Sequence, residues 1–392
     1  MFYWNLLVLG IAVASFAGWL YALYASQRTV RGVASLDRLP LRTREQWPTV
    51  SVIMPACNEA ATIGESLGSL LAQDYENLHV VAVNDRSTDE TGAIIDRRAL
   101  GDPRITALHV SELPEAWLGK VHALHLGTKM ARGTWLLFAD ADVHFGKEAL
   151  KRAVEYAEVN DLDSLTALPD VLPMGLLADA VYAAAGSLLC AGGRWAEVRD
   201  PRSSAFAGIG AFILVRRAAL ERSPGFEWLR LEVADDMGLG LLIKQHGGRC
   251  DVVNGVGVMQ LQFYSSFADM AAKMQKNYFG IMARFSALSA AVLAAFLVGS
   301  SLFPLVLYAA PGRPLVWALV GAGWLSLLGT SLTFARWARR AWLPCLLIQV
   351  GLVLVAYLMV RSTILGMRMG GITWRGQLYP TTLLAAAQRV RI

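Results

Sequence analysis

The sequence predicts an α/β domain with a mostly parallel sheet, joined at both ends of the chain to helices that could cross a membrane. The chain has 392 residues, of which 55% are hydrophobic and only 17% are charged. That composition is too apolar for an ordinary soluble protein, and the apolar excess lies near the two ends. The middle alternates short β-rich runs with segments of helical periodicity, which is typical of a parallel sheet covered by helices on both faces.

The N-terminal segment, residues 1–26, is predicted to be a membrane anchor. Residues 5–25 carry no charge and can span a hydrocarbon core, which needs about 20 residues. A signal peptide is the alternative, but the segment lacks a basic region before it and is long for a signal sequence. By the positive-inside rule, the basic linker at 27–48 places the next domain in the cytoplasm, so we expect an integral protein of the bacterial inner membrane. The basic residues of this linker are Arg28, Arg31, Arg38, Arg42 and Arg44.

The C-terminal part is predicted to contain about three transmembrane helices within residues 286–360. Three crossings would place the tail, residues 361–392, outside the cell, whereas its arginines favour the inside. The sequence leaves this conflict open. The three apolar segments are 286–310, 314–334 and 342–360.

Residues 263–285 mix aromatic residues and methionines with Lys and Arg. They are expected to form an amphipathic helix, which lies in the membrane interface or packs on the domain.

The α/β domain is predicted to cover residues 49–262. A further apolar stretch, 174–189, is rich in alanine, which favours a buried helix of this domain over a lipid-facing one. The other elements follow from periodicity and from helix-start residues. The expected strands are 49–56, 79–85, 104–110 and 134–140, and the expected helices are 61–73, 87–100 and 120–131.

Polar side chains follow three of these strands. They are Asn58 and Glu59, then Asp85 and Arg86, and then the pair Asp140 and Asp142. Ligands of parallel α/β sheets bind outside the carboxyl ends of the strands, so these residues predict a site at one edge of the sheet. A single Asp there could equally be a helix cap or an Asx turn, but the coincidence of three positions favours function.

The pair Asp140 and Asp142 has alternate positions at the end of an apolar strand, so both carboxylates face the same side. Like charges at about 4 Å repel by about 4 kcal/mol at an effective dielectric constant near 20, and a divalent cation reverses that cost. Mg²⁺ and Mn²⁺ prefer one or two carboxylates together with substrate phosphates. His144 follows on the same face, either as a further ligand or as an ordinary residue of the sheet edge.

A second acidic pair, Asp235 and Asp236, begins a segment of helical periodicity that ends at Gly247 and Gly248. The two carboxylates could cap the helix. They could also act in catalysis, because a carboxylate can deprotonate a hydroxyl that attacks a carbon whose leaving group departs. The two interpretations are compatible if Asp235 caps the helix and Asp236 faces the site.

Six stretches of the chain resemble a known family over about residues 49–260. The chain is similar to the membrane-anchored family 2 glycosyltransferases, whose domain has the Rossmann-like GT-A fold. The matching stretches, in order, are VSVIMPACNEA (50–60), VNDRSTDET (83–91), AWLGKVHALHLG (116–127), FADADV (138–143), GIGAFILVRRAAL (208–220) and VADDMGLGLLIKQHGG (233–248).

The resemblance implies a role for each matched residue. Asp85 would contact the base of a nucleotide-sugar donor, usually a uridine diphosphate sugar, and Arg86 would be a further donor-binding residue. Asp140 would contact the ribose or the diphosphate, Asp142 of the DxD motif would bind Mg²⁺ or Mn²⁺, and Asp236 would be the catalytic base of an inverting transfer, next to Asp235. The other donor-binding residues would be Pro55, Asn58, Glu59 and Lys120, although Lys120 alone also fits a solvated lysine at a helix start.

Two departures from the family pattern narrow the function. The usual Glu-Asp pair is Asp235-Asp236 here, which keeps the second position. Processive polysaccharide synthases have a QxxRW stretch after the base, whereas this chain has KMQKNYFG at 273–280, which favours transfer of one sugar. That segment and the tail GGITWRGQLYP (370–380) look like the enzymes that glycosylate ceramide, carotenoid or hopanoid lipids, so the expected acceptor is a membrane lipid in the bilayer.

Other functions are less consistent with the sequence. The alternatives are a polyprenyl-phosphate sugar synthase, a polysaccharide synthase and, remotely, a transporter or scaffold with an inactive nucleotide-binding domain. The net charge of +5 comes mostly from arginines that flank the membrane, which gives no reason to expect nucleic acid as a partner. The sugar and the lipid cannot be named from the sequence. Disulfides and structural zinc are not expected, because the cysteines are widely separated: Cys57, Cys190, Cys250 and Cys345.

Overall fold

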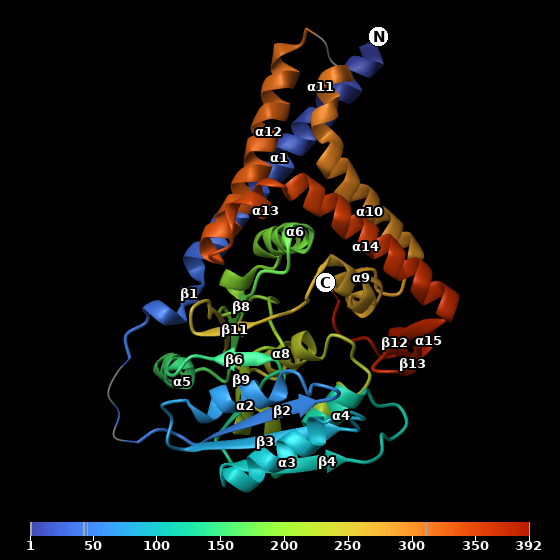
Figure 1. The fold of residues 1–392 in the computed structure, drawn as a ribbon. Coiled ribbons are helices and arrows are strands. Elements are labelled where there is room, and N and C mark those ends of the chain that lie inside the picture. Colours follow the sequence, from blue (N-terminus) through green and yellow to red (C-terminus); the bar gives the residue numbers. More distant parts are fainter. Residues whose placement is uncertain (1, 42–43, 45, 310–311, 392) are drawn as a thin grey trace. The chain divides into compact units, whose positions relative to one another are not determined.

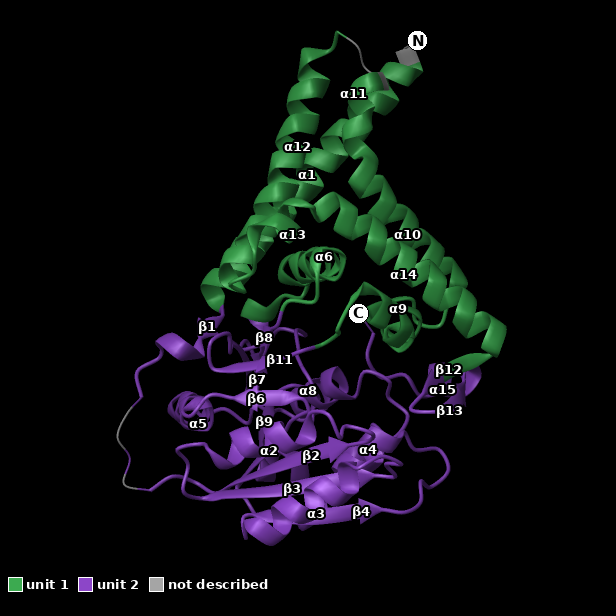
Figure 2. Ribbon diagram, viewed as in Figure 1, with its two compact units in different colours: residues 1–32, 173–196, 263–372 green, residues 33–172, 197–262, 373–392 purple. Residues whose placement is uncertain are grey.

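The chain forms two compact units in a computed structural model, which describes residues 2–41, 44, 46–309 and 312–391 (Figures 1 and 2). Arg42 of the expected basic linker lies outside the described residues. The α/β unit contains residues 33–172, 197–262 and 373–392, and the helical unit contains the rest. This division differs from the expected boundaries, because residues 173–196 group with the apolar helices and the tail from Thr373 groups with the α/β unit.

The α/β unit is built on an eight-stranded sheet in the order β1-β10-β7-β9-β5-β2-β3-β4. Every pairing is parallel except those of β9, which runs antiparallel to both β5 and β7. The predicted α/β class and the mostly parallel sheet are therefore confirmed. The strands are β1 (Ala34–Ser35), β2 (Val50–Ala56), β3 (Leu78–Asp85), β4 (Ile105–Val110), β5 (Trp135–Phe138), β7 (Ser164–Leu168), β9 (Ile213–Arg216) and β10 (Cys250–Asn254).

Helices and a small second sheet complete this unit. The second sheet has the order β6-β11-β8, formed by β6 (Val143–Phe145), β11 (Met259–Leu261) and β8 (Asp170–Val171). The helices are α2 (Ile63–Leu71), α3 (Thr91–Gly101), α4 (Gly119–Met130), α5 (Ala149–Val159), α7 (Arg217–Glu221), α8 (Asp235–Gln245) and α15 (Thr381–Ala387).

The central strands are buried on both faces because their residues are almost all apolar. All seven residues of β2, with the sequence VSVIMPA, are buried, which is typical of a parallel strand covered on both sides. Helix α2 buries Ile63, Leu67 and Leu70, the stripe that the sequence spacing predicts. Burial of these positions leaves the strand ends as the places where polar side chains can lie together.

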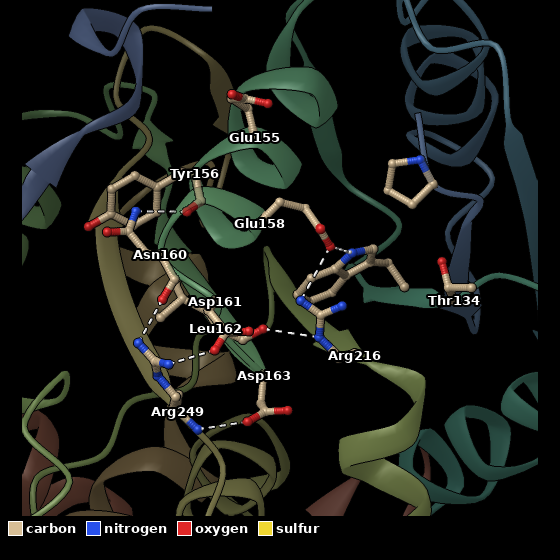
Figure 3. A network of polar contacts seen from close by, with 12 residues as sticks. Thr134, Glu155, Tyr156, Glu158, Asn160, Asp161, Leu162, Asp163, Arg216 and Arg249 are labelled. Atoms are coloured by element: carbon tan, nitrogen blue, oxygen red, sulfur yellow. Dashed lines mark hydrogen bonds and ion pairs between the residues drawn. The ribbon is translucent and has the colours of Figure 1, made fainter. Parts of the chain in front are cut away.

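A network of arginines and acidic residues lies where β7 and β10 begin (Figure 3). This is the end of the sheet opposite the carboxyl ends of the parallel strands, where the site residues were predicted. Arg249 pairs with Asp161 at 2.6 Å, and its backbone N–H donates to Asp163. Arg216 at the end of β9 pairs with Glu158, which also accepts a hydrogen bond from the Trp135 indole. These contacts join the ends of several strands, so acidic residues at this edge have a structural role.

The helical unit contains the apolar segments of both chain ends. Its helices are α1 (Phe2–Gly32), α6 (Leu176–Gly192), α9 (Phe267–Lys273), a π-helix (Lys276–Met282), α10 (Ala287–Leu302), α11 (Val306–Ala309), α12 (Pro314–Trp337), α13 (Trp342–Leu346) and α14 (Ile348–Met369). A short hairpin of β12 (Gly371–Trp374) and β13 (Gln377–Pro380) follows α14.

Five segments of the described chain are helical, long enough and apolar enough to cross a membrane, one more than expected: Tyr3–Gly32, Leu176–Glu197, Ala287–Tyr308, Pro314–Trp337 and Ile348–Met369. The additional segment contains α6, for which we favoured a buried helix of the α/β domain. The chain enters α6 from β7 and β8 and returns to β9, and β9 pairs directly with β7. Since one sheet lies on one side of a bilayer, α6 cannot be a complete single crossing.

The same reasoning applies to the C-terminal helices. Residues 197–262 and 373–392 belong to one compact unit, so if the chain between them crosses a membrane it must do so an even number of times. Three complete crossings by the candidate helices α10, α12 and α14 do not fit this connectivity.

Residues 263–285 form two helical pieces instead of the single amphipathic helix that we expected. Ser266 caps α9, accepting a hydrogen bond from the Asp269 N–H. The π-helix that follows ends where Arg284 and Phe285 have positive φ angles of 52° and 58°. Two residues in the left-handed conformation cannot continue a right-handed helix, so the next helix, α10, starts separately.

Candidate active site

Five of the residues expected in the site lie around one cavity of the α/β unit. Pro55 is the second-to-last residue of β2, and Asp140 follows β5. Both line the cavity together with Lys120 from α4 and the two aspartates at the start of α8. The remaining lining residues include Gly210, Phe138, Leu124 and Leu239. Of the residues expected in the site, Pro55, Lys120, Asp140, Asp235 and Asp236 line this cavity.

The other expected site residues are not among those that line it. They are Asn58, Glu59, Asp85, Arg86 and Asp142.

Lys120 is the central cation of this cavity. Its Nζ lies 2.7 Å from Asp140 Oδ1 and 3.2 Å from Asp235 Oδ2, and only 13% of its side chain is exposed. Burial disfavours the charged amine, but the charges of Asp140, Asp235 and Asp236 outweigh that effect and raise the pKa of Lys120. Lys120 is thus a fixed positive charge, and the alternative of a solvated lysine at a helix start is wrong.

Asp236 lies at the start of α8 with its carboxylate held by backbone amides. Its Oδ2 accepts the Gly210 N–H at 3.0 Å, and its Oδ1 accepts the Met237 N–H at 2.8 Å. The cap position of α8 is Ala234, which makes no side-chain hydrogen bond to the helix, so the interpretation of Asp235 as the helix cap is wrong. Asp235 is instead buried against Lys120.

Two glycines allow this close arrangement. A Cβ atom at Gly210 would lie 2.6 Å from Asp140 Oδ2, and one at Gly208 would lie 1.8 Å from the Asp236 carbonyl oxygen. Any side chain at either position would push the segment before β9 away from Asp140 or Asp236. This Gly-Ile-Gly stretch belongs to one of the six matched segments, but no role was expected for its glycines. A G-x-G pattern just before a strand could have indicated a close approach of the backbone there.

Asp142 is a partly buried carboxylate close to other acidic side chains. Burial, together with the nearby charges of Asp140 and Glu59, raises the pKa of Asp142 to about 7. Among the described residues there is no preformed group of three or more His, Cys, Asp or Glu side chains that could hold a metal ion. This donor set therefore fits Mg²⁺ or Mn²⁺ held by one or two carboxylates and completed by substrate phosphates.

Asp85 and Arg86 form the second part of the predicted donor site. Arg86 Nε donates to Asp85 Oδ1 at 2.8 Å, and this contact raises the pKa of Arg86. A Cβ at Gly119 would lie 2.5 Å from both side chains, so the start of α4 packs directly on the pair. Gly119 is a further residue to which the sequence analysis assigned no role.

Strained backbone marks the connections after β2 and β3. Asn58 has a φ of 56° and Arg86 a φ of 55°, in the left-handed region that non-glycine residues seldom adopt. Asn58 Oδ1 accepts the Thr88 N–H at 2.8 Å, and the Glu59 N–H donates to Thr91 Oγ1. These bonds join the two loops, and such over-determined strain is common at ligand sites.

His144 lies elsewhere. It belongs to β6, opposite Gln260 of β11, and lines a second pocket with Asp170 and Gly257. It is not among the residues that line the cavity around Lys120. A metal-binding role for His144 is therefore not part of the site described here.

Known proteins are similar to the part of the chain that contains Pro55, Lys120 and Asp140. Residues 51–222 match the family model described as Glycosyl transferase family 2. An uncharacterized glycosyltransferase of Bacillus subtilis, EpsJ, is 36% identical over 30% of this chain and 32% of its own length. An uncharacterized glycosyltransferase of Haemophilus influenzae is 33% identical over 30% of this chain and 35% of its own. The match thus covers about a third of the length of these relatives.

The fold is similar to that of a solved structure over nearly the whole chain. The mannosyltransferase PcManGT of Pyrobaculum calidifontis, solved with GDP-Man and Mn²⁺, superposes with a TM-score of 0.55 at 21% identity. The match covers 90% of this chain and 99% of that one. Taken with the sheet order, these similarities show that the fold is GT-A and that residues 51–222 are similar to glycosyl transferase family 2 domains.

Proposed function

We propose that the protein is a membrane-bound, metal-dependent and inverting glycosyltransferase. It moves one sugar from a nucleotide-diphosphate sugar, a uridine diphosphate sugar in our proposal, to a hydroxyl group of a membrane lipid. The observation that carries this proposal is the grouping of Asp140, Asp235 and Asp236 around Lys120 in one cavity, at the carboxyl end of the sheet.

Each part of the site has a task in this reaction. Asp85 and Arg86 bind the base, with Pro55, Asn58 and Glu59 lining the nucleotide pocket. Asp142 and Asp140 would hold Mg²⁺ or Mn²⁺, which would neutralise the charge of the departing diphosphate. Lys120 adds a fixed positive charge beside Asp140. The family 2 domain supports donor binding of this kind.

Asp236 is the catalytic base in this proposal. Its two oxygens are oriented by the amides of Gly210 and Met237 at the cavity that also contains Lys120. The carboxylate removes the hydroxyl proton while the oxygen attacks the anomeric carbon from the face opposite the nucleotide. A single displacement of this kind inverts the configuration at that carbon.

The apolar composition of the segments near both chain ends supports a lipid acceptor. Membrane helices hold a site at the headgroup plane, where a lipid hydroxyl gains effective concentration and orientation. The stretch KMQKNYFG at 273–280 has no Arg-Trp pair, which favours a single transfer over polymer synthesis. We place the α/β unit and the tail on the cytoplasmic side of the bacterial inner membrane, as the juxtamembrane arginines predict.

The proposal is tested with the full chain in nanodiscs made from bacterial lipid extract. Uridine and guanosine diphosphate sugars are supplied with Mg²⁺ or Mn²⁺, and the products are read by lipid mass spectrometry. We expect one lipid species to gain the mass of one sugar, and EDTA to abolish that gain. A ladder of masses would favour a polysaccharide synthase. Failure to release nucleotide from any donor would reject the enzyme.

A further inference from the structure

The last segment of the chain, residues 373–392, returns to the α/β unit and contacts the walls of the donor site. It is almost 300 residues from Asp85 in sequence, and nothing in its local pattern predicts that position. It begins within β12 and contains β13 and α15 (Figure 1). Three separate contacts hold it there.

The first contact starts at the hairpin turn. The two residues between β12 and β13 are Arg375 and Gly376, with φ angles of 49° and 80°. A two-residue turn with both φ angles positive strongly prefers Asn-Gly or Gly-Gly. An arginine in the left-handed region is disfavoured locally, so the backbone of the turn does not explain its presence there.

The Arg375 side chain reaches a carboxylate of the proposed nucleotide pocket. Its guanidinium lies 3.5 Å from Glu59 Oε1, with 26% and 31% of the two side chains exposed. Charged hydrogen bonds are normally about 2.7–2.9 Å long, so this pair is loose. Glu59 is also one of the charges that act on Asp142. The guanidinium therefore pairs with a carboxylate whose charge acts on Asp142, one of the proposed metal ligands.

The second contact is made by Tyr379, which is buried. Its hydroxyl donates a hydrogen bond to Gln377 Oε1 at 3.2 Å. Burial is the largest influence on the pKa of Tyr379 and raises it, and the nearby charges of Arg86 and Asp85 also act on it, so the hydroxyl stays neutral. Tyr379 is therefore a buried, neutral side chain within electrostatic reach of the Asp85–Arg86 pair, where the base is proposed to bind.

The third contact fixes the end of the segment. Glu232 is buried, and its Oε2 accepts the N–H groups of both Arg389 and Val390. Val390 is fully buried, next to Gly238 of α8. Glu232 lies three residues before Asp235. The segment is therefore attached both at the donor loops and at the start of the helix that carries the proposed base.

We propose that residues 373–392 are part of the donor site, with Arg375 as a ligand of the donor diphosphate and Tyr379 as a wall of the base pocket. The inference rests on the proposed function. When the donor binds, the guanidinium moves from Glu59 to phosphate oxygens, which a planar fork of N–H groups binds well. The C-terminal segment thereby becomes a determinant of affinity for the nucleotide.

The test is calorimetric titration of the full chain with UDP and with uridine, both in the presence of Mn²⁺, and with GDP and guanosine in parallel. We expect Arg375→Ala to weaken binding of the diphosphate about tenfold, in line with the loss of one charge-assisted hydrogen bond, and to leave the nucleoside unaffected. The affinity of Arg375→Lys for the diphosphate should lie between that of the wild type and that of Arg375→Ala. Tyr379→Ala should instead weaken the diphosphate and the nucleoside by the same factor.

Arg391→Ala is the matched control, because Arg391 is an exposed arginine of the same segment. It should bind like the wild type and unfold at the same temperature as Arg375→Ala. Unchanged or tighter diphosphate binding in Arg375→Ala overturns the inference, as does an equal loss for the nucleoside. A wild-type protein that binds neither nucleotide rejects the proposed function itself, which is a different result from a wild type that binds and a variant that binds equally well.

Discussion

Lys120 and Asp140 form an ion pair of 2.7 Å that joins helix α4 to the end of strand β5. The same amine also lies 3.2 Å from Asp235, at the start of α8. One lysine therefore connects the proposed donor side of the site to the proposed acceptor side. In the folded protein its charge offsets the repulsion between aspartates that lie far apart in the sequence.

Replacement of Lys120 by methionine should reduce both stability and activity. Asp235 is only 4% exposed and would lose its nearby cation. Breaking a buried pair in this way typically costs about 3 kcal/mol or more. Denaturant unfolding in detergent measures the loss. Lys129→Met, on the exposed face of the same helix, is the control. Equal stability of the two variants would show that Lys120 is not needed to balance the aspartates.

Asp236→Asn should separate binding from chemistry. The amide oxygen of asparagine can still accept the Gly210 N–H, whereas its NH2 group cannot accept the Met237 N–H, so the Gly210 contact and most of the nucleotide affinity should be retained. Removal of a general base typically costs a factor of about 10²–10⁴ in rate. Nucleotide titration and lipid glycosylation are measured on the same preparation. Transfer at the wild-type rate would mean that another group removes the proton.

Asp235→Asn serves as the comparison for that variant. Because Asp235 is buried against Lys120, we expect its replacement to disturb the stability of the fold together with activity. A loss of activity without a loss of stability would assign Asp235 to the chemistry as well.

Metal binding should depend on pH through Asp142. Its pKa is raised to about 7, so the carboxyl binds a proton below that pH and the proton competes with the cation. Affinity for Mn²⁺ in the presence of nucleotide should fall about tenfold for each pH unit below 7. Titration calorimetry from pH 5 to pH 8 measures the slope. Asp142→Asn should bind metal weakly at every pH, and a flat profile in the wild type would contradict the assignment.

The same group affects stability in the absence of metal, with a defined sign. A carboxyl whose pKa is higher in the folded protein than in the unfolded chain stabilises the fold at low pH. That stabilisation is lost as the pH rises from about 4 to about 7. At pH 5 the Asp142 carboxyl carries a proton that competes with the metal, whereas at pH 8 it is ionised. Added Mn²⁺ should therefore raise the unfolding temperature more at pH 8 than at pH 5.

The ion pair between Arg340 and Asp179 should be important for the helical unit. The two side chains are 2.7 Å apart and only 9% and 11% exposed, and they join α6 to the connection between α12 and α13. Arg340→Met should lower stability by about 3 kcal/mol, because it leaves Asp179 buried without its partner. Unfolding in detergent is the measurement.

The exposed neighbour Arg339 supplies the control for that pair, as Arg339→Met. The double variant Arg340→Met with Asp179→Leu should recover most of the loss, since two apolar side chains can replace a buried pair. No recovery in the double variant would mean that the charges themselves are required.

The secondary structure of the α/β unit could be predicted because its signals are local. Strand β2 is a run of buried apolar residues, and α2 has its apolar residues at helical spacing. The site residues near strand ends could be predicted for the same reason, since the end of a strand is marked in the sequence itself. The antiparallel direction of β9 could not, because strand direction depends on the path of the chain between strands.

Residues 263–285 show the limit of reasoning from composition. The mixture of apolar and basic residues favoured one helix, whereas the segment forms α9 and a π-helix. These pieces begin after the cap at Ser266 and end before the left-handed Arg284 and Phe285. Hydropathy similarly marked 174–189 as apolar without showing its partners. Only the pairing of β7 with β9 shows that a helix between them cannot cross a bilayer once.

The sequence by itself determined the α/β class, the positions of Asp85, Asp140, Asp142 and Asp236, and the apolar segments, because each depends on neighbouring residues. The tertiary structure decided which of these side chains meet: Lys120 with Asp140 and Asp235, and Asp236 with the Gly210 amide. It also decided that the C-terminal segment returns to the donor side, where Arg375 meets Glu59. Such contacts depend on how distant segments pack, and no local pattern encodes the ion pairs and backbone hydrogen bonds that fix them.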